Sequence, residues 1–494
     1  MSKFSNILEE LPNQISLVRE KFSIPAYAAA VVYQDEVVFA QGQGTRTVGR
    51  TEPVDEHSLF ALASISKSTA AACLGILVDE GRLAWDDPVR KYLPEFALQD
   101  NFATQEISIR DLLIHNSGLP SESGGTIWYG STLQRSEVLQ RLRFLKPERG
   151  FRTGYAYQNV TFLAAGEVIA AVSGKSWDDF VRERIFSPLG MRRTVTSLPE
   201  LMRMDNVTSP HALINDQVKT IAYRSHDNIG PAAAVNSSVW DWAQYIRMHL
   251  NSGEFNGERI LSPDRVSELW SAQTTIPIKT GSRLPEMLFP NFNAYGMGWF
   301  LRDYRGEKLV YHSGGVDGMR TLMVLLPRKK FGMALFTNLE PGYGLYPLKY
   351  WLLDQFLGFK DTPGPELWFQ QFEEFQAKQR KPIEVQLLPQ GIQAGLQFPL
   401  EAYCGIYQNP LVGNVELCGL DDGIHMSFEV NPVFSARLTP LQGNTFLIRW
   451  DDDFIPDGYL TFELDQQSKP GSIVFNQPRL IDVDFAELLL KRKS

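Results

Sequence analysis

A serine and a lysine stand three residues apart at Ser64 and Lys67, where an apolar run meets a helical pattern. Residues three apart lie on one face of a helix, so the lysine amine can reach the serine hydroxyl. A basic group beside a hydroxyl can take its proton and so activate the oxygen as a nucleophile. At the helix start, the Ser64 backbone N–H can also stabilise an oxyanion. The pair predicts covalent catalysis with Ser64 as nucleophile.

The Ser64–Lys67 pair needs two further conditions before it predicts an enzyme. The amine must be neutral, which burial and a neighbouring positive charge favour because both lower the pKa of a lysine. An isolated S-x-x-K also arises by chance on helix surfaces, so the motif needs partners elsewhere in the chain.

Tyr157 and Asn159 form a second polar group, placed after Gly154 and before the apolar run 162–165. A phenol that is hydrogen-bonded to a lysine can share in proton transfer, and an amide can hold a substrate carbonyl. Taken alone, a buried tyrosine and a turn asparagine explain the same residues. We expect Tyr157 to assist Lys67 and Asn159 to bind substrate.

A third group, His312-Ser313-Gly314-Gly315, follows a strand pattern that ends at about His312. Glycines beside a strand end let a substrate approach the backbone closely, and the Gly315 N–H can be a second oxyanion donor beside that of Ser64. A strand that simply ends in a glycine turn is the structural alternative.

Elements from distant parts of the chain must position these three groups. Strand patterns lie at 27–33, 37–42, 295–301, 309–312, 321–326 and 332–337, and helical patterns at 64–80, 177–186 and 240–250. Strands at both ends with helices between them predict an α+β fold whose antiparallel sheet is closed by distant segments. Such a sheet brings residues from far-apart segments into one cleft.

The C-terminal part of the chain has a different pattern. A polar helix at 368–381 and a Pro/Gln/Gly-rich stretch at 382–399 predict a linker, and short strand patterns after it predict a small β-barrel or sandwich. A chain of 494 residues exceeds one hydrophobic core, so two domains are expected. The expected division is a catalytic domain at 1–358, helix and linker at 359–399, and a β domain at 400–494.

The three groups together resemble the catalytic motifs of the penicillin-binding-protein and class C β-lactamase superfamily of serine hydrolases. The order is similar, with S-x-x-K first, Y-x-N second and H-S-G late in the chain. The resemblance covers about residues 12–355, including 111–119, which looks like the family's D-L-L-x-H-x-S-G-L segment, and 295–299. It implies a β-lactamase/DD-peptidase-like antiparallel sheet flanked by helices, with an inserted all-helical part.

The C-terminal part from about Leu400 looks like the lipocalin-like domain attached to some of these hydrolases. The residues that carry this likeness are Tyr403, Gly405, Tyr407 and Gly413. Such a domain would restrict access to the pocket or mediate oligomer contacts.

The family resemblance also implies a role for each motif residue. Ser64 would be the nucleophile and Lys67 with Tyr157 the proton-transfer pair. Asn159, His312 and Gly314 would bind substrate, and the N–H groups of Ser64 and Gly315 would form the oxyanion hole. His115 is expected to hold its loop.

His312 stands where β-lactamases and carboxypeptidases of this superfamily have a lysine opposite a substrate carboxylate. Histidine is largely neutral near pH 7, so capture of a carboxylate should be weaker. Family members with histidine here include esterases and aminopeptidases, which disfavours a β-lactamase role. A second departure is 232–234, three alanines where relatives are often glycine-rich, which would change the shape of the pocket.

The leading hypothesis is a hydrolase of amide or ester bonds in small peptide-like substrates, acting through an acyl-enzyme on Ser64. An amine in place of water as acceptor would make the same site an acyl transferase or peptide cyclase. A non-catalytic scaffold with this fold would not need Lys67 and Tyr157 at these spacings. A Ser-His-Asp hydrolase of the α/β type would need a G-x-S-x-G elbow, which the sequence lacks.

Composition limits the expected partners. The 48 basic and 57 acidic residues give a net charge of -9 without a basic stripe, so nucleic acid is not expected. No metal-ligand spacing is found, and no cofactor is expected. With no secretory signal or membrane-length apolar run, we expect a cytoplasmic protein that binds small molecules or short peptides; a homo-oligomer is compatible with the sequence. Cys73 should be a buried, inert thiol, and Cys404 and Cys418 are expected to be free.

Overall fold

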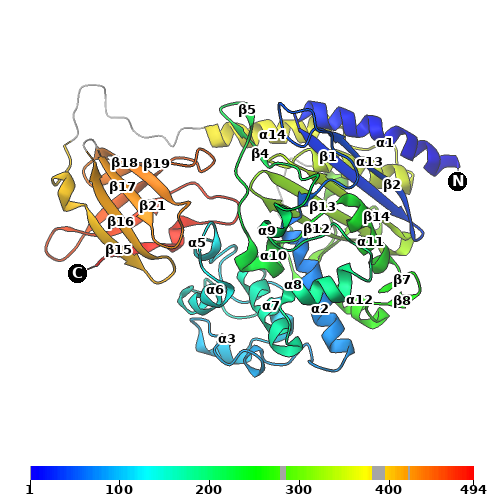
Figure 1. The fold of residues 1–494 in the computed structure, drawn as a ribbon, viewed down its shortest axis with the longest axis horizontal. Helices are drawn as coiled ribbons and strands as arrows, with labels where there is room; N and C mark the ends of the chain where they lie inside the picture. Colours follow the sequence, from blue (N-terminus) through cyan, green and yellow to red (C-terminus); the bar gives the residue numbers. More distant parts are fainter. Residues whose placement is uncertain (1, 279–284, 381–394, 421–422, 494) are drawn as a thin grey trace.

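The computed structural model describes residues 2–278, 285–380, 395–420 and 423–493. An eight-stranded antiparallel sheet lies at the centre of its larger part (Figure 1). In spatial order the strands are β2 (Glu36–Gly44), β1 (Ala26–Tyr33), β14 (Phe331–Thr337), β13 (Met319–Leu326), β12 (Glu307–Val316), β11 (Phe300–Tyr304), β10 (Asn293–Tyr295) and β9 (Thr274–Thr275). Two N-terminal strands therefore pair with six late ones, which confirms the α+β sheet closed by distant segments.

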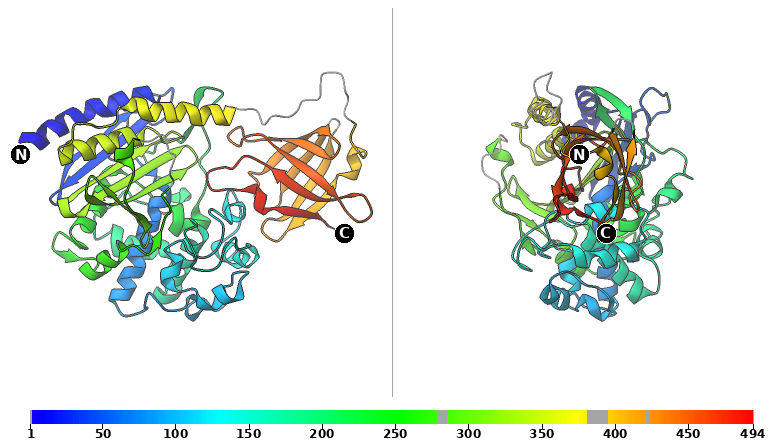
Figure 2. Two further views of the ribbon diagram at one scale, coloured as in Figure 1. Left: turned by 180° about the vertical axis from the view of Figure 1, so that it is seen from behind. Right: turned by 90° about the vertical axis from the view of Figure 1, so that its left-hand side faces the viewer.

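The two faces of the sheet are covered by different helices because strand residues alternate between faces. Tyr27, Ala29 and Val31 pack into one core with the terminal helices α1 (Ser2–Lys21), α13 (Leu345–Leu357) and α14 (Pro365–Arg380). Ala28 and Ala30 belong to the core of the other face, which includes α2 (Ser66–Asp79), α7 (Val160–Ser173) and α11 (Val239–Leu250). Figure 2 shows the two helix layers from behind and from the side.

A mainly helical part is inserted between β2 and β9. Besides α2, α7 and α11 it contains α3 (Asn101–Glu106), α4 (Ile109–Leu112), α5 (Gly125–Trp128), α6 (Arg135–Arg141), α8 (Trp177–Val181), α9 (Leu198–Leu201), α10 (Gly230–Ala233) and α12 (Pro263–Leu269). Short hairpins also occur there, β4 (His211–Ile214) with β5 (Gln217–Thr220), and β7 (Glu254–Phe255) with β8 (Glu258–Arg259). The predicted helix at 177–186 is α8 continued by a π-helical turn at Arg182–Phe186.

Two predicted strand boundaries are wrong. The run 295–301 is not one strand: residues 296–299 form a turn between β10 and β11, in which Gly298 takes φ 79° and the Gly296 N–H donates to the Trp299 carbonyl at 2.8 Å. The strand expected to end at His312 continues to Val316, since β12 keeps pairing with β13 as far as Val316 and Met319. The H-S-G-G group therefore lies within a strand and not in a turn after it.

The C-terminal part is a closed barrel, which decides between the barrel and the sandwich. Its strands are β15 (Gly405–Asn409), β16 (Gly413–Leu420), β17 (Gly423–Phe428), β18 (Ser435–Gln442), β19 (Thr445–Trp450), β20 (Gly458–Leu464), β21 (Pro470–Asn476) and β22 (Leu489–Arg492). Most of the predicted linker, 381–394, lies outside the described residues. Cys404 and Cys418 are free, as expected, and Cys73 is buried.

The barrel docks on the segment around α5 (Figure 1). The buried Asn431 side chain donates to the Thr126 and Tyr129 carbonyls at 3.0 and 2.9 Å, and the Tyr129 ring stacks on Phe434 with centroids 5.7 Å apart. Arg224 pairs with Asp317 of the sheet part and with Asp452 of the barrel. The two parts therefore share a buried polar and aromatic interface.

No helix in the described ranges is long and apolar enough to cross a membrane.

Candidate active site

Ser64 lies in a tight turn at the start of α2. The turn is a 3-10 helix, Ala63–Ile65, entered through φ 53° at Ala63. The turn is held against Val235, the residue before the strand β6 (Asn236–Ser237). The Leu62 N–H donates to the Val235 carbonyl at 2.8 Å, and the Val235 N–H donates to Ser66 Oγ at 3.0 Å. These bonds hold Ser64 at the N-terminus of the helix. The residue is 9% exposed.

Lys67 reaches Ser64 from the next turn, as the spacing predicts. Its Nζ lies 3.1 Å from Ser64 Oγ, 2.6 Å from Asn159 Oδ1 and 3.1 Å from the Ala232 carbonyl oxygen. Lys67 is fully buried. Burial lowers the pKa of its amine to about 7, although the charge of Asp482 acts in the opposite direction. The amine therefore exists in both neutral and charged forms near pH 7.

The Tyr157 ring covers this amine. The Lys67 Nζ lies 4.7 Å from the ring centroid, and the phenol interacts with the Ser64 side chain. Burial raises the pKa of Tyr157 well above its ordinary value, so the phenol is protonated at neutral pH and can donate. The three residues predicted to do chemistry thus meet at one point.

His115 holds the Tyr157 loop, the structural role expected for it. Its Nδ1 accepts from the Gln158 N–H at 3.0 Å, and its carbonyl accepts from Ala156 N–H at 2.8 Å. The imidazole is buried with its centroid 4.4 Å from that of Tyr157. The position of the phenol therefore depends on the 111–119 segment.

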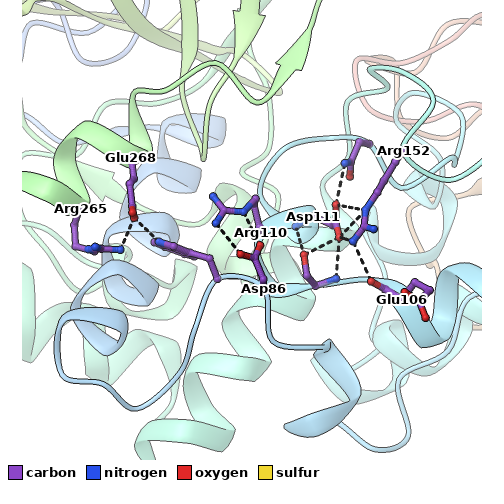
Figure 3. A network of polar contacts seen from close by, with 10 residues as sticks. Asp86, Glu106, Arg110, Asp111, Arg152, Arg265 and Glu268 are labelled. Carbon is purple, nitrogen blue, oxygen red and sulfur yellow. Dashed lines mark hydrogen bonds and ion pairs between the residues drawn. The ribbon is translucent and has the colours of Figure 1, made fainter.

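An ion pair at the base of this segment ties it to the loop before Tyr157 (Figure 3). The Arg152 Nε donates to Asp111 Oδ1 at 3.0 Å, while Asn116 Nδ2 donates to the same oxygen at 2.9 Å. Arg152 Nη2 also donates to the Glu106 carbonyl at 3.1 Å. The D-L-L-x-H pattern thus builds the support of Tyr157.

His312 lies beside the site but is engaged within the protein. Its Nδ1 lies 2.7 Å from the Ser313 carbonyl oxygen, so this nitrogen carries the proton and Nε2 accepts from the Tyr295 hydroxyl at 2.9 Å. It is only 1% exposed, and burial, with a smaller effect of Lys67, lowers its pKa to about 3. His312 is therefore neutral at pH 7.

Gly314 and Gly315 bring β12 against the Ser64 turn. A side chain at Gly314 would place its Cβ 2.0 Å from the Leu62 carbonyl oxygen, so only glycine permits this approach. The strand β11 pairs with β12 only as far as Tyr311. Beyond that residue, β11 does not cover the edge of β12 that carries Gly315.

A small cavity that opens to solvent lies near the site. Its lining includes Ala233, Ala234, Val316, Asp317 and Arg224. The two alanines follow Ala232, whose carbonyl accepts from Lys67, and Val316 follows Gly315. Of the three alanines at 232–234, Ala233 and Ala234 therefore form part of the wall of this cavity.

Two groups at the site were missed by sequence reasoning. The Ala232 carbonyl accepts from Lys67, but a backbone acceptor leaves no signal in a sequence. Asp482 interacts with Lys67 and Asn159 from the loop between β21 and β22 of the barrel. Asp482 lies outside the three sequence motifs that begin at Ser64, Tyr157 and His312.

Residues 15–356 match the family model described as Beta-lactamase, and residues 396–491 match one described as a domain of unknown function, DUF3471. The first match covers more than half of the chain. The chain belongs to the Beta-lactamase family. Ser64, Lys67, Tyr157 and His312 lie within the Beta-lactamase match, whereas Asp482 lies within the DUF3471 match.

Beta-lactamase family relatives include a protein named Unguisins hydrolase ungD' from Aspergillus campestris. It is 28% identical over 348 residues, which are 68% of this chain and 63% of that relative, so the match spans less than two thirds of the relative's length. An octameric penicillin-binding protein homologue from Pyrococcus abyssi shares the fold with a TM-score of 0.61, 21% identity and 98% and 99% of the two chains covered. A D-amino acid amidase from Ochrobactrum anthropi has a TM-score of 0.57 at 22% identity, over 71% and 98% of the chains.

Within the described residues, no group of three or more His, Cys, Asp or Glu side chains is arranged to hold a metal ion.

Proposed function

We propose that this protein is a serine hydrolase that cleaves amide or ester bonds of small peptide-like substrates through an acyl-enzyme on Ser64. The observation that carries the proposal is the buried Lys67 amine, 3.1 Å from Ser64 Oγ and with a pKa lowered to about 7. A lysine in this state is the base that a serine nucleophile needs at neutral pH.

In the first half-reaction, Lys67 takes the proton from Ser64 as the oxygen attacks the substrate carbonyl carbon. The backbone N–H groups of Ser64 and Gly315 stabilise the negative oxygen of the tetrahedral intermediate. The protonated Tyr157 phenol, adjacent to both Ser64 and Lys67, passes a proton to the leaving group and takes one back from the Lys67 ammonium, which leaves Lys67 neutral again. Water then attacks the ester on Ser64, and the same groups act in reverse.

The neutral His312 supports the choice of substrate. A buried histidine with both ring nitrogens engaged offers no positive charge to a substrate carboxylate. Asn159 would instead hold the peptide-like part in a pocket shaped by His312, and Gly314 would place β12 beside it through the close approach of this strand to Leu62. The hydrolase name of the Aspergillus campestris relative agrees with amide or ester cleavage.

We propose the division into a catalytic domain at 1–358, a connecting helix and linker at 359–399, and a lipocalin-like β domain at 400–494. The closed barrel and its interface with α5 support it.

A fluorophosphonate probe tests the nucleophile. It should label the peptide that contains Ser64, and Ser64→Ala should abolish the label. Ser68→Ala is a matched control, because Ser68 lies on the same helix with its hydroxyl donating to the Ile65 carbonyl at 2.8 Å, and labelling should persist. Labelling that persists in Ser64→Ala would contradict the proposal. Products from p-nitrophenyl esters, aminoacyl anilides and added amines then separate hydrolysis from acyl transfer.

A further inference from the structure

The last residues of β12 have a neighbouring strand on one side only. β11 pairs with β12 as far as Tyr311, whereas β13 pairs with it as far as Val316. Gly315, the proposed second oxyanion donor, lies in this one-sided stretch. A donor N–H stabilises an oxyanion well only when it is held in place before the reaction. The end of β12 therefore needs support that β11 does not give.

Arg320 lies directly opposite Gly315 in the ladder between β12 and β13. Its guanidinium folds over the glycine, because a Cβ on Gly315 would lie 3.1 Å from Arg320 Nη1 and 3.2 Å from its Cζ. Neighbouring strand residues point to opposite faces of a sheet. The Thr321 hydroxyl donates to the Leu62 carbonyl at 2.9 Å, so Arg320 supports β12 from the face away from the Ser64 turn.

The guanidinium joins the two strands where their hairpin turns. Arg320 Nη1 donates to the Val316 carbonyl at 2.7 Å and to the Met319 carbonyl at 2.8 Å. Val316 is the last residue of β12, and Met319 is the first of β13. One nitrogen therefore fixes both ends of the turn, next to Gly315.

Glu340 holds the other nitrogen of the guanidinium. Its carboxylate forms an ion pair with Arg320 Nη2 and accepts from the Gly318 N–H at 3.3 Å, while its own N–H donates to the His211 carbonyl at 3.1 Å. The stem of Arg320 is confined as well, since a Cβ on Gly342 would lie 2.5 Å from its Cγ. The guanidinium therefore has little freedom to move.

We propose that Arg320 is a positioning residue of the active site, which fixes the Gly315 N–H where the negative oxygen of the tetrahedral intermediate forms. The inference rests on the proposed function, because it takes Gly315 as an oxyanion donor. Glu340 offsets the charge of Arg320, so the effect comes from the placement of β12 and not from a net positive charge at the site.

Arg320→Lys tests the placement while keeping an ion pair with Glu340. A lysine ammonium has a single nitrogen, so it cannot bind Glu340 and bridge Val316 and Met319 at the same time. Acylation and deacylation of Ser64 both pass through an oxyanion, so both steps should slow. For a p-nitrophenyl ester, kcat should fall about tenfold or more and KM should stay within about twofold. Arg320→Met removes every one of these bonds and should lose at least as much.

Phenylboronic acid gives a second readout of the same effect. Its boron forms a bond with the oxygen of a serine nucleophile as the serine proton passes to the base, and the product is a negatively charged tetrahedral adduct. Because this adduct resembles the intermediate, its inhibition constant should rise by about the factor by which kcat falls. A change in stability alone would not alter the inhibition constant of the folded enzyme.

Arg305→Met is the matched control. Arg305 lies in the turn between β11 and β12, at the other end of β12 from Gly315. Its side chain is 11% exposed, against 12% for Arg320, and its Nε lies 3.1 Å from Oδ1 of the buried Asp354. Breaking this ion pair should lower the urea midpoint of unfolding. The values of kcat and of the boronate inhibition constant should stay those of the wild type.

Two results would overturn the inference alone. One is wild-type kcat and boronate affinity in both Arg320 variants, and the other is an equal loss of kcat in Arg305→Met. A wild-type protein that a fluorophosphonate labels elsewhere than at Ser64 would overturn the proposed function itself.

Discussion

At the scale of single residues, the protonation of Lys67 decides when Ser64 can react. Burial brings the pKa of the amine down to about 7 from the 10.5 of a free lysine, so the neutral form gains population as pH rises through 7. We expect the rate of Ser64 labelling by a neutral fluorophosphonate to rise over the same range. Lys67→Arg keeps the charge at all these pH values and should slow labelling by about 100-fold or more.

Lys349→Met provides the control for this prediction. Lys349 is also a buried lysine, packed 4.9 Å from the Tyr311 ring centroid, with a pKa lowered well below its usual value by burial. It lies on α13, over the other face of the sheet from Ser64. Its replacement should leave labelling and its pH dependence unchanged. Equal losses in both variants would mean that burial of any lysine, and not its place beside Ser64, governs the rate.

At the scale of elements, β12 and the Ser64 turn depend on each other through Gly314. In Gly314→Ala the added Cβ would meet the Leu62 carbonyl oxygen at 2.0 Å and Thr321 Oγ1 at 2.4 Å, so the strand or the turn must move. Such overpacking costs about 1–3 kcal/mol of unfolding free energy. Since Leu62 is two residues before Ser64, the rate of Ser64 labelling should fall as well. Urea unfolding measures the loss of stability, and the fluorophosphonate probe measures the labelling rate.

Gly419→Ala is the comparable change in a barrel strand. There the new Cβ would meet Cys404 Sγ at 3.6 Å, an ordinary contact. This variant should unfold and react much like the wild type. If Gly314→Ala behaved in the same way, the close packing of β12 on the turn would have no role in placing Ser64.

At the scale of the whole molecule, Arg224 joins the sheet part to the barrel. Its Nε lies 3.1 Å from Asp317 Oδ2, its Nη2 pairs with Asp452, and the Asp317 side chain is 3% exposed. Arg224→Met would leave Asp317 buried without its cation and should lower the unfolding free energy by about 3–5 kcal/mol. Denaturant unfolding, followed by the fluorescence of tryptophans in both parts, measures the loss.

Arg449→Met serves as the surface reference. Arg449 is 67% exposed and lies 3.9 Å from Asp457, so its removal should change stability by less than about 0.5 kcal/mol. A similar small effect for Arg224→Met would show that the ion pairs of the interface do not hold the two parts together.

The sequence by itself determined the local chemistry and the fold class. Ser64 and Lys67 are neighbours because helical geometry places residues three apart on one face, and this needs no tertiary information. Apolar runs bounded by turn residues likewise indicated β1 and most late strands, because both faces of this sheet are buried under helices and its strands are therefore apolar throughout. The end of β12 was misjudged because its pairing with β13, and not its own residues, decides how far it extends.

Only the tertiary structure decided which distant groups meet at Ser64. The ordinary pKa of histidine already predicted a largely neutral His312, but the burial that lowers this pKa further and the bond to the Tyr295 hydroxyl are contacts that spacing cannot predict. Asp482 reaches Lys67 because the barrel closes and docks against α5, and the Coulomb interaction between them depends on that distance in space alone. A residue so far along the chain carries no local signal of its role.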